Sequence, residues 1–339
     1  MSKSVKICIL FNFVDKPFGG GNQFLRALRK YFNALGIYTE SPQNADAVLF
    51  NSHHSIPNVA KTKLKYPQKK FIHRIDGPMR LYSNPRDERD KIVYEANQFL
   101  ADATVFQSEW SRQYNYRLGL RKKELEFVIT NAPDTDIFNR KDKIAFSKDR
   151  KIRIISTSWS SNLKRGFKIY QWLDNNLDFE KHQMTFVGNS PIEFKNIKHL
   201  QPLQSTELSK ILKNSDIFIT ASQNDPCSNS LIEALHCGLP ALVLNGGGHP
   251  EIIRQGGEVF ETKEQIPLLL EKIVNNYELY RDRIAVPTIE QVGQEYYNAI
   301  IKVCQSAKEH KFGVFKYCRL LSTINFWHAL GQIFGFFRR

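Results

Sequence analysis

The sequence has few cysteines and no long apolar run, and each shortage excludes a class of protein. The cysteines are odd in number, scattered, and without the paired spacing of a zinc site or a disulfide framework, which favours a reducing compartment. No apolar run reaches the ~20 residues of a membrane-spanning helix, and the N-terminus lacks the apolar core of a signal peptide. We therefore expect a cytoplasmic protein. The five cysteines are Cys8, Cys227, Cys237, Cys304 and Cys318.

Acidic residues are also in short supply. The chain has 34 of them against 48 lysines and arginines, a formal net charge of +14. Such an excess suits nucleic acid, anionic lipid or nucleotide phosphates as partners. Basic residues crowd two segments, 61–70 and 117–123. Charge runs are also common on ordinary solvated faces, so their position alone leaves these alternatives open.

Apolar strands alternate with amphipathic helices along most of the 339 residues. A polar stretch at 139–151 has the composition of a linker, and the alternation restarts after it. Repeated βα units predict an α/β protein with two facing doubly wound, Rossmann-like domains. Their ligands are expected beyond the carboxyl ends of the strands, in the cleft between domains. The predicted segments are 1–145, 146–288, a C-terminal helix at 289–310 and a tail at 311–339.

The most informative segment runs from Asp225 to Pro240 and follows an apolar run that predicts a buried strand. Ser228, Asn229 and Ser230 open a helix, and the free N–H groups at a helix start attract an anion. Glu233 lies one turn inside, where a carboxylate can bind ribose hydroxyls. The segment therefore predicts a nucleotide site. An ordinary strand, loop and helix with a solvated Glu233 is the simpler alternative.

Two other loops follow predicted strands. Gly20 and Gly21 open a helix and let a ligand approach the backbone, although the GxGxxG pattern of a dinucleotide site is absent. The loop with Asn162 carries Lys164 and Arg165, and adjacent cations of this kind can neutralise a diphosphate. A solvated pair of cations is the alternative.

Polar residues also end the strand at 71–75. His73, Arg74 and Asp76 lie where such a fold places its site, and Asp76 could orient an acceptor hydroxyl or take its proton. A structural histidine is the alternative for His73. Asp134 and Asp136 form a DxD pattern, but they precede the linker and are explained by turn chemistry. We expect no metal site and no cofactor.

Together these residues resemble the retaining GT-B glycosyltransferases of group 1, the family 4 class. The resemblance covers roughly residues 5–305 and is most specific in 225–240, where Asp225 stands in place of the family's first glutamate. It implies that Glu233 binds the ribose, that Asp225 and His73 contact the transferred sugar, and that Arg165, with Lys164, binds the diphosphate. It also implies that the helix at 289–310 packs back across the cleft.

The implied activity is transfer of a hexose from a nucleotide sugar, with UDP and GDP equally open, to a glycan or lipid-linked acceptor. Configuration at the sugar would be retained and no metal would be needed, because cations and the helix start stabilise the leaving diphosphate. A nucleotide-sugar epimerase of the same fold is the main alternative. A basic nucleic-acid-binding protein is a further alternative, although aromatics are not interleaved with cations as such a surface requires.

The tail after residue 310 is rich in aromatic and basic residues. On a helical projection its apolar residues share a broad face, which suits a helix lying in a membrane interface with basic groups on lipid phosphates. Docking on the first domain and a dimer contact are the alternatives. We expect peripheral association with the inner face of a membrane. The residues of the apolar face are Leu320, Ile324, Trp327, Leu330, Ile333, Phe334 and Phe337.

Overall fold

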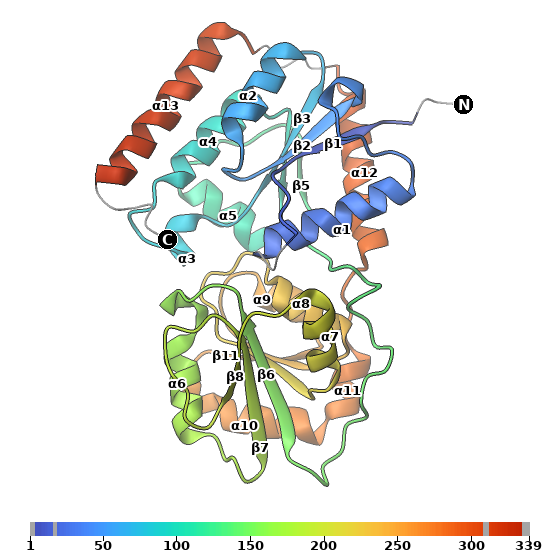
Figure 1. Cartoon of the computed structure of the whole chain (residues 1–339), viewed down its shortest axis with the longest axis vertical. Helices are drawn as coiled ribbons and strands as arrows, with labels where there is room; N and C mark the ends of the chain where they lie inside the picture. Colours follow the sequence, from blue (N-terminus) through green and yellow to red (C-terminus); the bar gives the residue numbers. More distant parts are fainter. Residues whose placement is uncertain (1–3, 16–18, 308–311, 334–339) are drawn as a thin grey trace. The chain divides into compact units, whose positions relative to one another are not determined.

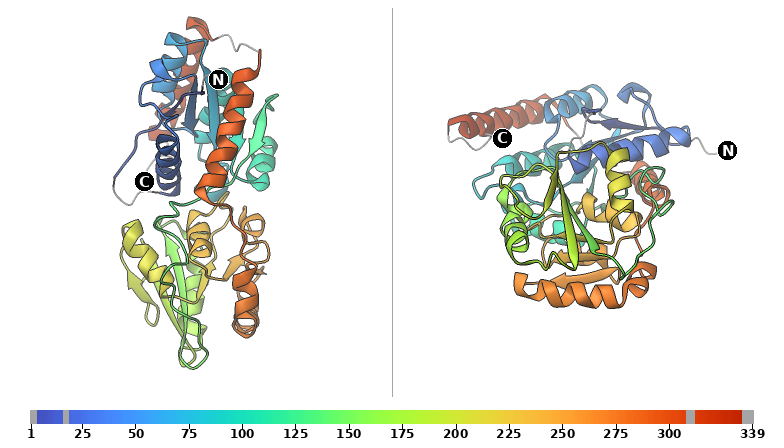
Figure 2. Two further views of the ribbon diagram at one scale, coloured as in Figure 1. Left: turned by 90° about the vertical axis from the view of Figure 1, so that its right-hand side faces the viewer. Right: turned by 60° about the horizontal axis from the view of Figure 1, so that its bottom comes forward.

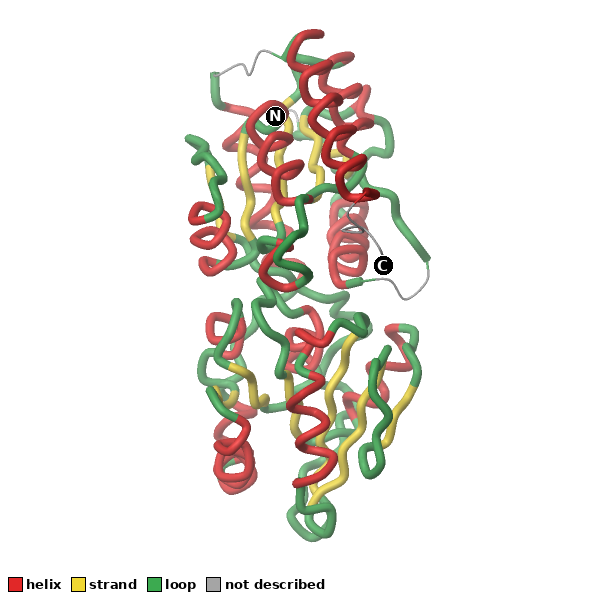
Figure 3. Tube along the Cα trace, turned by 90° about the vertical axis from the view of Figure 1, so that its left-hand side faces the viewer, coloured by secondary structure: helices red, strands yellow, loops and turns green. Residues whose placement is uncertain are grey.

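The computed structural model describes residues 4–15, 19–307 and 312–333, apart from the side chains at 328 and 330–333. The chain divides into two compact units (Figure 1). The first consists of residues 1–13, 28–130 and 290–339, and the second of 14–27 and 131–289. Each unit is built on a parallel sheet, shown in yellow in Figure 3, with helices against its faces. The α/β fold predicted from the alternation is confirmed.

The first unit has a five-stranded sheet in the order β1-β2-β3-β4-β5. Every residue of β2 is buried, as expected of a central parallel strand whose two faces are covered by helices. The strands are β1 (Ile7–Leu10), β2 (Ala47–Asn51), β3 (Lys70–Ile75), β4 (Ala103–Phe106) and β5 (Glu126–Val128). The connecting helices are α2 (Ile56–Lys65), α3 (Met79–Tyr82), α4 (Arg89–Leu100) and α5 (Glu109–Arg117).

The second unit has a six-stranded sheet in the order β11-β10-β9-β6-β7-β8. Two apolar clusters of buried side chains line its faces. Its strands are β6 (Ile152–Ser158), β7 (His182–Gly188), β8 (Lys198–Leu200), β9 (Ile217–Thr220), β10 (Ala241–Leu244) and β11 (Gly257–Phe260). Its helices are α6 (Phe167–Asn176), α7 (Ser205–Lys213), α8 (Asn229–His236), α9 (His249–Ile253), α10 (Ile266–Asn275) and α11 (Tyr277–Asp282). Helix α1 (Gly20–Ala34) begins in this unit and ends in the other.

The boundary between the units differs from the predicted linker. The chain enters the second unit at residue 131 rather than near 145. Phe138 is buried in one apolar cluster of that unit, and Ile137 packs against the same cluster. The polar stretch after them is therefore a surface segment of the second unit.

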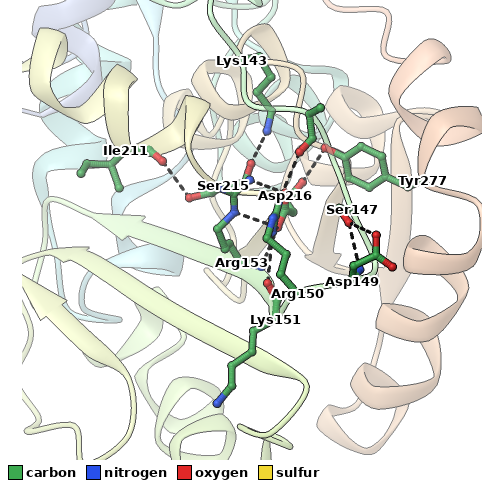
Figure 4. A network of polar contacts seen from close by, with 11 residues as sticks. Lys143, Ser147, Asp149, Arg150, Lys151, Arg153, Ile211, Ser215, Asp216 and Tyr277 are labelled. Atoms are coloured by element: carbon green, nitrogen blue, oxygen red, sulfur yellow. Dashed lines mark hydrogen bonds and ion pairs between the residues drawn. The ribbon is translucent and has the colours of Figure 1, made fainter.

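A buried carboxylate fixes that segment to the sheet (Figure 4). Asp216 precedes β9 and has no exposed side-chain surface. It accepts hydrogen bonds from Arg150 at 2.7 and 3.0 Å, and from the side chain of Arg153 at 2.9 and 3.1 Å. Burial opposes ionisation of Asp216, but these bonds outweigh it and hold its pKa below the usual value.

We expect Asp216→Asn to lower the melting temperature of the second unit by about 6–12 °C. Removing the charge leaves Arg150 and Arg153 without their partner. The free energy of unfolding should fall by about 3 kcal/mol, near the low end for buried pairs, because both guanidinium groups reach solvent. Calorimetry measures the shift. It should shrink as the pH falls below about 4, where Asp216 of the unfolded chain takes up a proton, and vanish below the lowered pKa of the folded state. Asp149→Asn, an exposed aspartate shown in the same figure, is the control, and an equal effect of both changes would contradict this account.

The C-terminal part of the chain returns to the first unit. Helix α12 (Ile289–Gln305), orange in Figure 2, contacts α1. At this contact Gly293 leaves room for the ring of Tyr31. A side chain on Gly293 would come within 2.2 Å of that ring. Helix α13 (Val314–Ile333) then packs beside α2 and α4.

The tail therefore docks on the first unit, which is one of the alternatives that the sequence left open. Phe312, Leu320 and Ile324 are buried in the apolar cluster of α2, α4 and the sheet, and Trp327 packs against it. Lys311 and residues 334–339 lie outside the described residues. No helix within the described ranges is long and apolar enough to cross a membrane.

Candidate functional site

The strand order of the second unit places a crevice between β6 and β9. From β6 the chain proceeds outward to β7 and β8 on one side, and from β9 to β10 and β11 on the other. Ligands of open parallel sheets bind at such a switch point, beyond the carboxyl ends of the two central strands. The loops that leave those ends are 159–166 and 221–228. They carry most of the residues that the sequence predicted for the diphosphate and the sugar.

An ion pair joins the two loops. The Nη1 atom of Arg165 lies 2.7 Å from Oδ2 of Asp225 and 3.2 Å from Oγ of Ser222. Both charged side chains keep some contact with solvent, with exposed fractions of 25% and 14%. Arg165 is therefore fixed in place at the switch point, and its guanidinium group is accessible to an anion.

Two glycines allow this close approach of the loops. Gly166 has a φ of +96°, and a side chain there would come within 2.5 Å of Ala221. Gly247 has a φ of +63°, and a side chain there would come within 2.0 Å of the Asp225 carbonyl oxygen. Only glycine fits both the positive φ and the contact. The backbone thus fixes the positions of Arg165 and Asp225.

Helix α8 begins at the same edge of the sheet. Ser228 caps the helix by accepting a hydrogen bond from the Leu231 N–H at 3.4 Å. Asn229 is the first residue of the helix, and Asn131 donates a hydrogen bond to its side-chain oxygen at 2.7 Å. Ser230 follows, with its hydroxyl 3.5 Å from that of Ser228. The start of the helix is ordered by side chains and directs backbone N–H groups outward.

The predicted glycine turn lies beside this helix start. Gly20 and Gly21 are the first residues of α1. A side chain at position 20 would come within 2.4 Å of the Asn229 amide, so Gly20 is in close contact with α8. The structure thus brings together, within one unit, two segments that the sequence predicted to bind the donor and that are about 200 residues apart in the sequence. Phe18, which precedes the turn, lies outside the described residues.

Glu233 is the unusual carboxylate of the site. Its side chain is packed within the protein, although the residue as a whole keeps some exposure, and it has no hydrogen-bond or ion-pair partner among the described residues. This burial raises its pKa to about 8. A desolvated carboxyl group one turn inside a helix can take hydroxyl groups of a ligand as its missing donors.

Asn162 and Lys164 shape the first of the two loops. The Asn162 side chain accepts a hydrogen bond from the Lys164 N–H at 2.9 Å, and the Lys164 carbonyl accepts one from the Gln223 N–H at 2.8 Å. Asn162 therefore stabilises the conformation of the loop 159–166. These bonds position the Lys164 backbone between the two loops.

The sequence prediction missed His249. This residue follows β10 and is fully buried, with Nδ1 3.2 Å from the Leu244 carbonyl oxygen and Nε2 without a partner among the described residues. Burial lowers its pKa, while Asp225 acts in the opposite direction. Its position in a glycine-rich turn after a strand is the feature that could have identified it. With its pKa lowered by burial, His249 is a neutral residue near Asp225.

The first unit has a polar cluster of its own at the carboxyl ends of β2, β3 and β4. Arg74 is fully buried and donates to Asn51 and, at 3.1 Å, to Asp76. Gln107 also donates to Asp76. Arg74 and Asp76 were predicted as acceptor-binding residues, and the structure places them together. Asn51 and Gln107, each next to the end of a strand, were missed.

His54 extends this cluster. Burial lowers its pKa, and the negative charge of Asp76 acts in the opposite direction. Its ring lies 5.1 Å from that of Phe11. The cluster therefore combines a carboxylate, an amide, a guanidinium group and an imidazole, a set that can bind several hydroxyl groups.

The position of His73 does not support the sugar contact predicted for it. The residue has no exposed surface, and its ring stacks on Phe50 with the centres 4.2 Å apart. Its Nε2 lies 2.9 Å from the Ser52 carbonyl oxygen and its Nδ1 3.3 Å from the Asn97 amide on α4. Burial lowers its pKa to about 3. Because successive side chains of a strand face opposite sides, His73 faces the helix layer and joins the core.

The DxD pattern forms a turn, as the sequence analysis proposed. Asp134 accepts a hydrogen bond from the Asp136 N–H at 3.1 Å, and its carbonyl accepts from the N–H groups of Ile137 and Phe138. In the part of the chain that the structure describes, no group of three or more His, Cys, Asp or Glu side chains is placed to hold a metal ion.

Comparison with known proteins gives these sites a context. Residues 192–285 match the sequence model of the family described as glycosyl transferases group 1. A probable sucrose-phosphate synthase of Thermosipho melanesiensis is 25% identical over 263 residues, which cover 69% of this chain and 61% of that relative. The chain thus matches less than two thirds of that relative's length.

Solved structures share the fold at low identity. HepE of Anabaena in complex with UDP aligns with a TM-score of 0.60 and 13% identity, over 88% of this chain and 97% of that one. Sucrose-phosphate synthase of Thermosynechococcus elongatus aligns with a TM-score of 0.62 and 13% identity, over 97% of this chain and 100% of that one. The chain therefore has the GT-B fold, with two parallel α/β units, and its residues 192–285 resemble the group 1 glycosyl transferases.

Proposed function

We propose that this chain transfers a hexose from a UDP or GDP sugar to a glycan or lipid-linked acceptor. One observation carries the proposal. At the switch point of the second unit, the Arg165–Asp225 pair lies at the carboxyl ends of β6 and β9, and α8 begins nearby with Glu233 in its first turns. A cation and a helix start suit a diphosphate, and an unpartnered carboxyl group suits a ribose.

The departing nucleotide is stabilised by residues of this chain. Breaking the bond between sugar and phosphate places negative charge on the nucleoside diphosphate. Arg165, Lys164 and the N–H groups at the start of α8 are positioned to take up that charge, so the transfer proceeds without a metal or another cofactor. Asp225, already paired with Arg165, is left to orient hydroxyls of the sugar.

The acceptor binds at the polar cluster of the first unit. Asp76 and Arg74 orient its hydroxyl, and His54 adds a third hydrogen-bonding group. The acceptor attacks on the face from which the phosphate leaves, and that phosphate helps to remove the proton, so the product keeps the configuration of the donor sugar. Proton NMR of the purified glycoside product reports the configuration of the new bond, and an inverted anomer would show that this step is assigned wrongly.

The same reaction at a membrane face would serve polysaccharide biosynthesis. We place the protein on the inner face of an anionic membrane, in keeping with its charge of +14.

A nucleotide screen tests the donor assignment. We expect UDP or GDP at 100 times its dissociation constant to stabilise the second unit by about 2.7 kcal/mol, a rise in melting temperature of about 5–11 °C. UDP is the first probe because HepE, a neighbour in fold, was solved with UDP and with UDP-glucose. UMP, which lacks the second phosphate, is the matched control. Equal shifts with UMP and UDP would count against the diphosphate site, and no shift with any nucleotide would overturn the proposal.

A further inference from the structure

A cavity lies entirely within the first unit. It has a volume of about 360 Å³, and its lining residues come from α4, α13 and the loop after α5. None of its residues belongs to the sites described above. It is lined by Lys91, Tyr94, Glu95, Gln98, Phe99, Gly119, Arg121, Arg319 and Trp327.

The cavity is cationic. Three of its side chains are basic and one is acidic. Lys91 pairs with Glu88 at 2.8 Å and lies 3.7 Å from the centre of the Trp327 ring. Arg319 lies 5.1 Å from the centre of the Phe99 ring. Within the described ranges, Arg121 and Arg319 form no ion pair, so two guanidinium groups at this cavity lack a counter-charge.

Two buried polar atoms at the cavity also lack partners. The Tyr94 hydroxyl and Oε2 of Glu95 are inaccessible to solvent and form no hydrogen bond with any described residue. Such atoms usually have a partner, because leaving one without costs about 1–3 kcal/mol. Because neither atom is reached by solvent, the chemistry that the cavity offers to a ligand is set by its exposed guanidinium groups.

The helix that closes the cavity carries an exposed aromatic stripe. Phe315 and Phe326 have exposed fractions of 81% and 57%, and Arg319 lies between them at helical spacing. The opposite side of α13, with Leu320 and Ile324, is buried in the unit. Exposed aromatic side chains beside basic groups are typical of a helix that contacts lipid headgroups.

We propose that this cavity binds the phosphate of a lipid headgroup. Arg121 and Arg319, both exposed and both lining the cavity, bind the phosphate. Phe315 and Phe326 enter the interface beside it. This inference specifies the membrane association proposed above and does not depend on the transfer reaction.

The test uses the full-length protein and vesicles of phosphatidylcholine with 30% phosphatidylglycerol. Flotation should show binding that falls about ten- to thirtyfold in the Arg121→Gln/Arg319→Gln variant, because each basic residue near an anionic surface contributes about three- to fivefold. Lys168→Gln/Lys198→Gln, which removes the same charge from exposed positions of the second unit, should bind as wild type does. Phe315→Ser/Phe326→Ser, which changes exposed side chains only, should also weaken binding.

Further arms separate the outcomes. Calorimetric titration with glycerol 3-phosphate tests whether a soluble phosphate ester is the ligand. If the protein binds this ester through Arg121 and Arg319 but does not bind vesicles, the lipid assignment is overturned and only the phosphate site is supported. If the Arg121→Gln/Arg319→Gln and Lys168→Gln/Lys198→Gln variants lose vesicle binding to the same extent, binding depends on net charge alone and the proposal is overturned. UDP-induced stabilisation, measured in every variant, should stay unchanged, so failure here and failure of the donor site are told apart.

Discussion

Changing Lys164 and Arg165 together to alanine is expected to lower turnover by 10²-fold or more. The reason is the charge that develops on the leaving diphosphate, since removing one well-placed donor of this kind costs about 10²–10³ in rate. Arg165 should contribute more than Lys164, because its ion pair fixes it at the carboxyl end of β9. Steady-state kinetics with saturating donor measures the loss.

The Arg165 variant needs its own control, because removing the arginine leaves Asp225 without its partner at 2.7 Å. An unpaired carboxylate there would repel the diphosphate. Arg165→Ala/Asp225→Asn removes that repulsion, and Arg165→Lys keeps the charge. Part of the activity should return in both. Lys168→Ala, an exposed change in the first turn of α6, should leave the rate unaltered. Turnover near the wild-type value in the Lys164/Arg165 double variant would end this assignment.

Glu233→Gln should weaken nucleotide binding while stabilising the free protein. Burial raises the pKa of Glu233 to about 8, so the folded protein holds a proton there that the unfolded chain releases near pH 4.5. Stability therefore falls as the pH rises from about 4.5 to 8. The glutamine variant loses this penalty, so its melting temperature should exceed that of wild type at pH 8.5, and the difference should vanish as the pH falls to about 4.

Binding should show the opposite trend. Ribose hydroxyls donate to the ionised carboxylate, so wild-type affinity for the nucleotide should rise between pH 6 and 8.5, by up to tenfold per unit below the pKa. The glutamine variant should lack this increase and bind about 50- to 100-fold more weakly at pH 8.5, as expected from losing charge-assisted hydrogen bonds. The terminal phosphate itself titrates near pH 6, so the difference between the two proteins is the quantity to compare. Parallel pH profiles would exclude Glu233 from the ribose site.

The grouping of the residues proposed to bind the donor was predictable because their signals are local. The loops that carry Arg165 and Asp225 each follow an apolar strand, and the small polar residues that begin α8 cap it as expected. Parallel sheets bring the ends of such strands to one edge, so local patterns were sufficient to group these residues. The contact of Gly20 with Asn229 depends on long-range packing and could only be guessed from the glycines.

Orientation was the harder part of the prediction. His73 and Arg74 are adjacent, yet His73 faces α4 and Arg74 faces the polar cluster. A short buried strand has apolar residues on both faces, so its sequence does not indicate which side chains point toward the polar cluster. The tail posed a similar problem. Its amphipathic pattern predicted a helix with an apolar face, but the same face fits a lipid or a protein surface. Short elements with weak periodicity, β8 and β11 among them, were missed.

The return of the chain to the first unit affects how the protein is made. When the ribosome has released residue 289, the second unit has all of its sequence, whereas the first still lacks α12 and α13. Until Leu320 and Ile324 emerge, the apolar surface of α2 and α4 that they cover, including Val59 and Ile92, stays open to water. Nascent or prematurely terminated chains should therefore depend on chaperones, and the unit synthesised first is completed last.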